Sequence, residues 1–166
     1  MAKAFFGGIH PDDMKAATNG KAIYPIPSPK QVIIHLARRG QEPCRPMVSP
    51  LSRYAGSTCT PLVKVGDRVR LGQCIGVPAD AMAAPVHASV SGTVTAVEQR
   101  LGAVGGSVLS IEIQNDFQDE ISPEVCAPAD PRRLSTEQMI EAIKKAGVVG
   151  EDRSSIPVYR KISRGI

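Results

Sequence analysis

Short apolar stretches separated by glycine turns fill the middle of the sequence and limit the folds it can adopt. Between Leu62 and Val77, valine, leucine and isoleucine alternate with polar or small residues, which is the period of a half-buried β-strand. Gly66-Asp67 and Gly72-Gln73 interrupt this alternation, and glycine supplies the positive φ that tight turns require. The pattern predicts short strands hinged at glycine turns.

Three further segments share the strand period: residues 32–36, 90–98 and 108–113. The glycine-rich residues 102–106 precede the last of them. Because a strand and not a helix follows these glycines, we expect a hairpin loop there and not a phosphate site. With 15 Gly, 14 Pro, no Trp and 4% aromatic residues, the composition favours a mainly β body with an aliphatic core.

The order of these turns and strands resembles the biotinyl/lipoyl-like hammerhead, a barrel-sandwich hybrid. The matching residues are Val65 to Ile75, Ala84-Pro85-Val86 and Ser91-Gly92-Thr93-Val94. A carrier domain of this kind holds its cofactor on a lysine at the tip of an exposed hairpin. The corresponding residues, Val77 to Ala84, contain no lysine, so we expect neither biotin nor lipoate.

The barrel-sandwich domain is expected over residues 31–116, with simpler segments on either side. Residues 1–30 are expected to form an extended arm, because alternating prolines at 25, 27 and 29 remove backbone donors. Prolines mark 117–134 as a linker, and 148–166 is expected to be a basic tail. A helix is predicted over 135–147, with Ser135 and Gln138 as a capping box and Gly147 as its end.

A weak internal repeat lies between the first predicted strand and the glycine turns. Residues 35–49 align with residues 50–64, which pairs Cys44 with Cys59 and Pro46 with Pro61. Both a short tandem duplication, with 36–49 as the added copy, and chance similarity remain open. Whether Cys44 and Cys59 converge in space is equally open.

Candidate reactive residues are few. The 4 cysteines form no C-x-x-C chelate, so we expect reduced, mostly inert thiols and no metal site. Cys59, Cys74 and His87 are the candidates for chemistry, with His87 favoured as a turn anchor over a proton-transfer group. We expect no catalytic activity from this chain alone.

Charge and hydropathy set the expected location. The net charge is +4 and the tail carries Arg160, Lys161 and Arg164, which we interpret as a solvated or protein-binding surface, since no aromatic interleaving supports nucleic acid. No apolar stretch reaches the roughly 18 residues of a membrane span, and residues 1–8 show no secretion signal. We therefore expect a cytoplasmic chain that reaches a membrane only through a partner.

Several motifs together resemble the C-type subunits of the Rnf electron-transport complex and their relatives, which include the electron-transfer protein associated with proline reductase. They are Phe6-Gly-Gly-Ile-His-Pro11, Pro50-Leu-Ser-Arg-Tyr-Ala-Gly56, Pro61-Leu-Val-Lys-Val-Gly-Asp67, Ala84-Pro-Val-His-Ala-Ser-Val-Ser-Gly-Thr-Val94 and Ile143-Lys-Lys-Ala-Gly-Val-Val-Gly150. In that family, this domain precedes a flavin- and NADH-binding domain, a β-grasp module and two four-iron clusters.

One departure from the family changes what the resemblance implies. The flavin domain of the family opens with a glycine-rich loop, where this chain has Glu151-Asp-Arg-Ser-Ser-Ile156. Two carboxylates there repel an anion, and the glycines that let backbone approach a phosphate are missing. We therefore expect no cofactor: neither flavin, nor NADH, nor an iron–sulfur cluster.

The resemblance implies a non-catalytic subunit or adaptor of a redox complex, with other protein subunits as partners. The expected docking residues lie in the arm and the tail: Gly7, Gly8, His10, Pro11, Arg160, Lys161 and Arg164. Two alternatives stay open. The chain contributes Cys59 or Cys74 with His87 to an active site shared with a partner, or it binds a small ligand in the barrel.

Overall fold

A computed structural model describes residues 15–37, 58–81, 83–102, 107–125, 130–150 and 156–163. Within these ranges the strands are β1 (Gln31–His35), β2 (Cys59–Pro61), β3 (Arg68–Val69), β4 (Cys74–Pro78), β5 (Val86–His87), β6 (Gly92–Leu101) and β7 (Ser107–Asn115). The helical segments are η1 (Lys15–Ala17), η2 (Pro131–Arg133), α1 (Thr136–Lys145) and α2 (Val158–Ser163).

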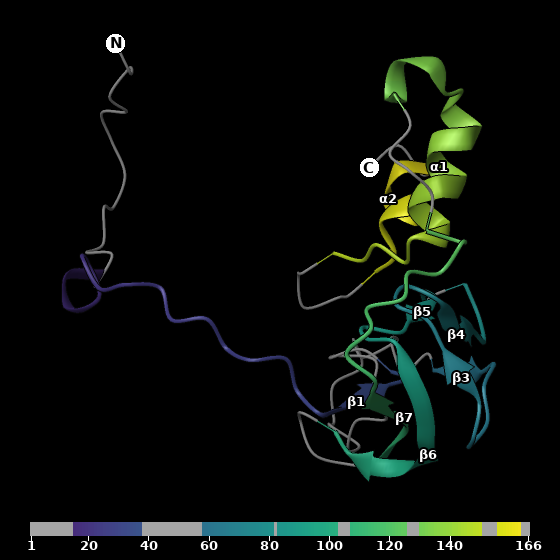
Figure 1. Cartoon of the computed structure of the whole chain (residues 1–166). Coiled ribbons are helices and arrows are strands. Elements are labelled where there is room, and N and C mark those ends of the chain that lie inside the picture. Colours follow the sequence, from purple (N-terminus) through teal and green to yellow (C-terminus); the bar gives the residue numbers. More distant parts are fainter. Residues whose placement is uncertain are drawn as a thin grey trace, which may run out of the picture.

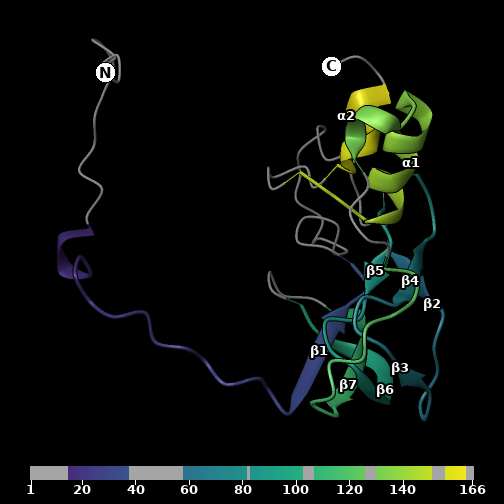
Figure 2. The ribbon, with the colours of Figure 1, turned by 45° about the horizontal axis from the view of Figure 1, so that its top comes forward.

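The strands form two antiparallel sheets, as Figures 1 and 2 show. One sheet has the order β1-β7-β6-β3 and the other the order β2-β4-β5. The hairpin of β6 and β7 is the longest pairing, and its register shifts between Val94 and Ala96. Such a bulge increases local twist, which curls the sheet. The mainly β, barrel-sandwich prediction is confirmed.

The core is aliphatic and lies between the sheets. Ile75, Val69, Ile111 and Ile113 are fully buried, and they come from β4, β3 and β7. The rest of the buried cluster is Leu36, Cys59, Ala83, Val86, Ala88, Val90 and Val94. The glycine turns of the sequence are also present, since Gly66 has a φ of 94° and Gly72 a φ of 80°.

The first part of the predicted linker belongs to the body. The Leu71 N–H donates to the Glu120 carbonyl at 2.8 Å, and the Ser122 N–H donates to the Leu71 carbonyl at 2.9 Å. These bonds place residues 120–122 against the edge of the sheet beyond β3. The prolines that suggested a linker follow only at Pro123, which is where the backbone pairing ends.

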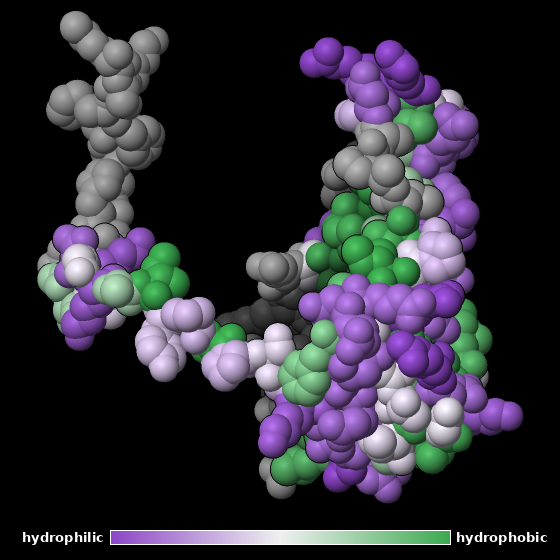
Figure 3. All heavy atoms as spheres, in the orientation of Figure 1, coloured by the Kyte–Doolittle hydropathy of each residue, from purple (hydrophilic) through white to green (hydrophobic). Residues whose placement is uncertain are grey.

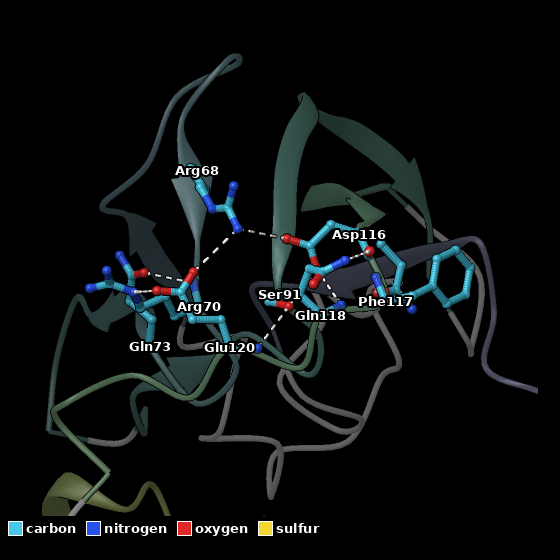
Figure 4. A network of polar contacts seen from close by, with 9 residues as sticks. Arg68, Arg70, Gln73, Ser91, Asp116, Phe117, Gln118 and Glu120 are labelled. Atoms are coloured by element: carbon cyan, nitrogen blue, oxygen red, sulfur yellow. Dashed lines mark hydrogen bonds and ion pairs between the residues drawn. The ribbon is translucent and has the colours of Figure 1, made fainter.

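A charged network holds this segment in place (Figure 4). The Ser91 hydroxyl donates to Asp116 at 2.6 Å, while Arg68 contacts Asp116 at 3.1 Å and Glu120 at 3.2 Å. Arg70 Nε donates to Glu120 at 2.7 Å. The hydrogen bond from Ser91 is the main cause that lowers the pKa of Asp116, and the hydrogen bond from Arg70 is the main cause that lowers the pKa of Glu120.

Replacing Asp116 with asparagine is expected to lower stability at neutral pH and to flatten its acid dependence. Because the folded-state pKa of Asp116 lies below its ordinary value of 3.8, its stabilisation is present above that value and is lost as the pH falls through the folded-state pKa. Urea unfolding at pH 7 and at pH 3 measures this. Asp119→Asn, an exposed neighbour, is the control, and an Asp116→Asn deficit that is equal at both pH values contradicts the assignment.

The C-terminal region is more ordered than a basic tail. Helix α1 begins at the predicted capping box, with both the Ser135 and the Gln138 hydrogen bonds present. Gly147 follows it with a φ of 67°. A bridge between Val149 and Pro157 then leads into α2, which lies beside α1 in both ribbon views (Figures 1 and 2). The sequence pattern did not predict α2, because a helix of 6 residues is too short to show a period.

Candidate functional site

The loop between β4 and β5 lies under helix α2. Tyr159 Oη and Arg160 Nη1 donate to the Ala81 carbonyl at 3.3 Å and 3.1 Å. Ala83 and Ala84 are only 2% and 3% exposed. This loop corresponds to the hairpin whose tip a carrier domain exposes. Here it lacks the lysine and two of its residues are buried.

A cavity of about 630 Å³ lies between the β4–β5 hairpin and the two helices. On the face drawn in Figure 3, hydrophobic residues also gather where the helices meet the sheets. The side chains and backbone around the cavity come from four separate parts of the chain. They are Gly72, Cys74, Val77, Pro78, Ala83, Pro85, His87, Glu124, Glu141, Lys144, Lys145 and Tyr159.

Two of the three candidate reactive residues meet in this cavity. Cys74 and His87 are paired across β4 and β5, and both line the cavity wall. Cys59 is elsewhere: it is 6% exposed and belongs to the buried core. Its thiol donates to the Ala84 carbonyl at 3.2 Å, so it packs as a small apolar residue.

The surroundings of Cys74 do not activate its thiol. Burial raises the pKa of Cys74, and the carboxylate of Glu124 raises it further, against a lowering effect of the Gly76 backbone hydrogen bond. A nucleophilic cysteine needs the opposite shift, because the thiolate is the reactive form. A cysteine active site shared with a partner is therefore poorly supported at this position.

His87 lies against the end of α1. An added Cβ on Gly147 would lie 3.6 Å from His87 Cε1 and 2.5 Å from the Pro85 carbonyl oxygen. The ring thus packs at the point where the helix meets β5. This placement agrees with the expected anchoring role, in which the histidine fixes the turn before the return strand.

Most of the predicted docking residues lie outside the described ranges. These are Gly7, Gly8, His10, Pro11 and Arg164, and the same holds for Cys44. Arg160 and Lys161 belong to α2. Both are partly buried, and the guanidinium of Arg160 bonds to the loop after β4, so it also holds the helix in place.

The arm exposes a set of apolar side chains that the sequence motifs did not single out. Ile23, Tyr24 and Ile26 are 97%, 86% and 88% exposed. The arm is fixed where it enters β1: the Asn115 side chain donates to the Pro29 carbonyl at 2.9 Å, and the Asn115 N–H donates to the Lys30 carbonyl at 2.9 Å. Large apolar residues interleaved with prolines were the available signal.

Metal clusters and membrane-crossing helices are both absent from the ranges described above. Among those residues, no three histidine, cysteine, aspartate or glutamate side chains gather as metal ligands. Likewise, none of the helices described here has the length and apolar character needed to cross a membrane.

The two curled sheets and the covered hairpin define a barrel-sandwich hybrid without the modified lysine of a carrier. The RnfC barrel sandwich hybrid domain matches residues 3–50 and 47–118. The chain belongs to this family. The two matched stretches meet at 47–50, which is also where the two copies of the internal repeat meet.

Curated relatives match nearly the whole chain. It is 35% identical over 159 residues to the C-type subunit of the Na(+)-translocating ferredoxin:NAD(+) oxidoreductase complex of Acetobacterium woodii, covering 96% of this chain and 32% of the relative. It is 31% identical to the C-type subunit of the proton-translocating ferredoxin:NAD(+) oxidoreductase complex of Clostridium ljungdahlii, with coverages of 98% and 32%. The corresponding subunit of the ion-translocating oxidoreductase complex of Vibrio cholerae is also 31% identical, with 98% of this chain and 19% of the relative covered. The chain therefore spans a third or less of these relatives.

Proposed function

We propose that this chain is a non-catalytic subunit or adaptor of an oxidoreductase complex of the Rnf type. Its relatives are named as subunits of such complexes, and the part they share with this chain is the barrel-sandwich body. The raised pKa of Cys74 removes the main support for chemistry in this part. Location in the cytoplasm and membrane contact only through a partner belong to the same proposal.

The observation that carries the proposal is the exposed arm. Monomeric proteins rarely expose neighbouring large apolar side chains without a function, and here Ile23, Tyr24 and Ile26 are each more than four-fifths exposed. The prolines between them limit the backbone to extended conformations, so little conformational entropy is lost on binding. Lys21 and Lys30 flank the apolar residues and no acidic residue lies between them. An apolar groove bordered by carboxylates would match this segment.

Substituting aspartate for both Ile23 and Ile26 is expected to reduce recovery of partner subunits about tenfold, because it places charge at two apolar contact residues. Recovery is measured by affinity purification of the tagged full chain from its native organism, with mass spectrometry of the copurified proteins. Leu101→Asp is the matched control, since Leu101 is an apolar residue on β6 that is 80% exposed.

Two outcomes contradict the proposal. One is a parent chain that purifies without any subunit of an Rnf-type complex or of a proline reductase complex, the other partner that the resemblance includes. The second is equal recovery of those subunits by the parent and by the arm variant. Equal loss in the Leu101→Asp control shows that the arm is not the docking element.

A further inference from the structure

The cavity between the β4–β5 hairpin and the helices has the dimensions of a small-molecule site. Its volume of about 630 Å³ falls in the range of pockets that enclose drug-sized ligands. It lies at the helical end of the body, whereas the arm leaves the body at β1 (Figures 1 and 2). The cavity is therefore separate from the docking element proposed above.

One side of the cavity is apolar and formed by rigid groups. Val77 and Pro78 come from the end of β4, and Ala83 and Pro85 come from the loop before β5. Tyr159 adds its ring from α2, and its hydroxyl is held by the Ala81 carbonyl at 3.3 Å. Proline rings, strand residues and a fixed aromatic ring lose little freedom when a ligand binds. An apolar ligand body fits this wall.

The charged groups of the rim are not equally available to a ligand. Lys144 contacts Glu141 at 3.8 Å and lies 5.8 Å from the centre of the Tyr159 ring. Glu124 accepts a hydrogen bond from the Cys74 N–H at 3.4 Å. Lys145 also lines the cavity, and no side-chain hydrogen bond or ion pair joins it to any residue that the structure describes. The rim thus offers one ammonium group beside the apolar wall.

From this arrangement we infer that the cavity binds a small organic monoanion with an apolar body, such as an aliphatic or aromatic carboxylate. The apolar part lies on Val77, Pro85 and the Tyr159 ring, and the carboxylate pairs with Lys145. A doubly charged phosphate fits less well, because Glu124 and Glu141 also face the cavity and repel added negative charge. An uncharged ligand leaves the ammonium without a partner.

Octanoate and 1-octanol test this inference as a matched pair of probes, because they share the alkyl chain and differ in charge. Titration of the isotopically labelled full chain, followed by NMR, is expected to shift amides of β4, β5 and α1 with both probes and to show tighter binding of octanoate. Lys145→Gln is expected to weaken octanoate binding about fivefold, the size of one partly exposed ion pair, and to leave octanol binding unchanged.

Two further variants test the position of the apolar wall. Val77→Phe narrows the cavity and is expected to weaken both probes about fivefold, whereas Ile33→Phe, on an exposed part of β1, changes neither. Lys64→Gln is the charge control for Lys145→Gln, because Lys64 lies at the glycine turn before β3. Thermal unfolding of each variant confirms that it folds.

Three results overturn the inference: no amide shifts at β4, β5 or α1 with either probe, shifts confined to other strands, or an octanoate affinity that Lys145→Gln leaves unchanged. None of these measurements involves a partner protein. Failure here leaves the docking proposal intact, and failure of the pull-down leaves this one intact.

Discussion

Replacing Gly92 with alanine is expected to lower the melting temperature by about 10 °C, from a loss of about 3 kcal/mol in the free energy of unfolding. Gly92 opens β6 and pairs with Asn115 in the longest hairpin. A Cβ at this position would collide with the backbone carbonyl of Gln114 and lie 3.3 Å from Asn115 Cα. Backbone in the middle of a paired sheet cannot move aside as a side chain can.

Backbone conformation adds to this steric cost. Gly92 has a φ of 156°, which a residue with a Cβ adopts only under strain. Gly66→Ala separates the two causes, because Gly66 has a φ of 94° and a Cβ there meets nothing within 4 Å. We expect Gly66→Ala to cost about 1 kcal/mol. Circular dichroism during thermal and urea unfolding measures both variants, and equal losses would show that the collision with Gln114 is unimportant.

Replacing Gly147 with alanine is expected to loosen the helices from the β4–β5 hairpin while the sheets stay folded. Its Cβ would lie 2.5 Å from the Pro85 carbonyl oxygen, at a φ of 67°. We expect about 2 kcal/mol of local destabilisation. Hydrogen exchange is the measurement, and amides of α1 and α2 should exchange faster while those of β6 and β7 do not.

Gly147→Asn is the companion variant for this experiment. Asparagine tolerates left-handed backbone better than alanine but carries the same Cβ. Similar loosening by both variants assigns the effect to the contact with Pro85, and loosening by alanine alone assigns it to the backbone conformation. Unchanged exchange in α1 and α2 with both variants would mean that Gly147 does not hold the helices to β5.

The parts of the fold that sequence reasoning identified have local signals. The turns at Gly66 and Gly72 follow from a requirement for positive φ, and the start of α1 follows from the Ser135 and Gln138 capping pair. The alternation of Ile111 and Ile113 with polar residues marked the strand that lies at the centre of the larger sheet. Each of these features depends on residues close together in the chain.

The features without a local signal depend on distant contacts. Helix α2 is stabilised by its place beside α1 and by the bonds of Tyr159 and Arg160 to Ala81, and none of these contacts leaves a periodic pattern. The cavity joins residues of β4, the loop before β5, α1 and α2. Cys74 and His87 stand out in the sequence for their side-chain chemistry, and only the pairing of β4 with β5 brings them together.

The charged network around Arg68 and Glu120 also bears on self-association. Strand β3 is the outer strand of the larger sheet, and an exposed sheet edge is a template on which a second chain can add a strand. Here that edge is only 2 residues long, and the segment from Asp116 to Ser122 occupies the space beyond it. The same ion pairs that bind this segment therefore protect the protein from aggregation at this edge. Acid conditions that protonate Asp116 and Glu120 would uncover it.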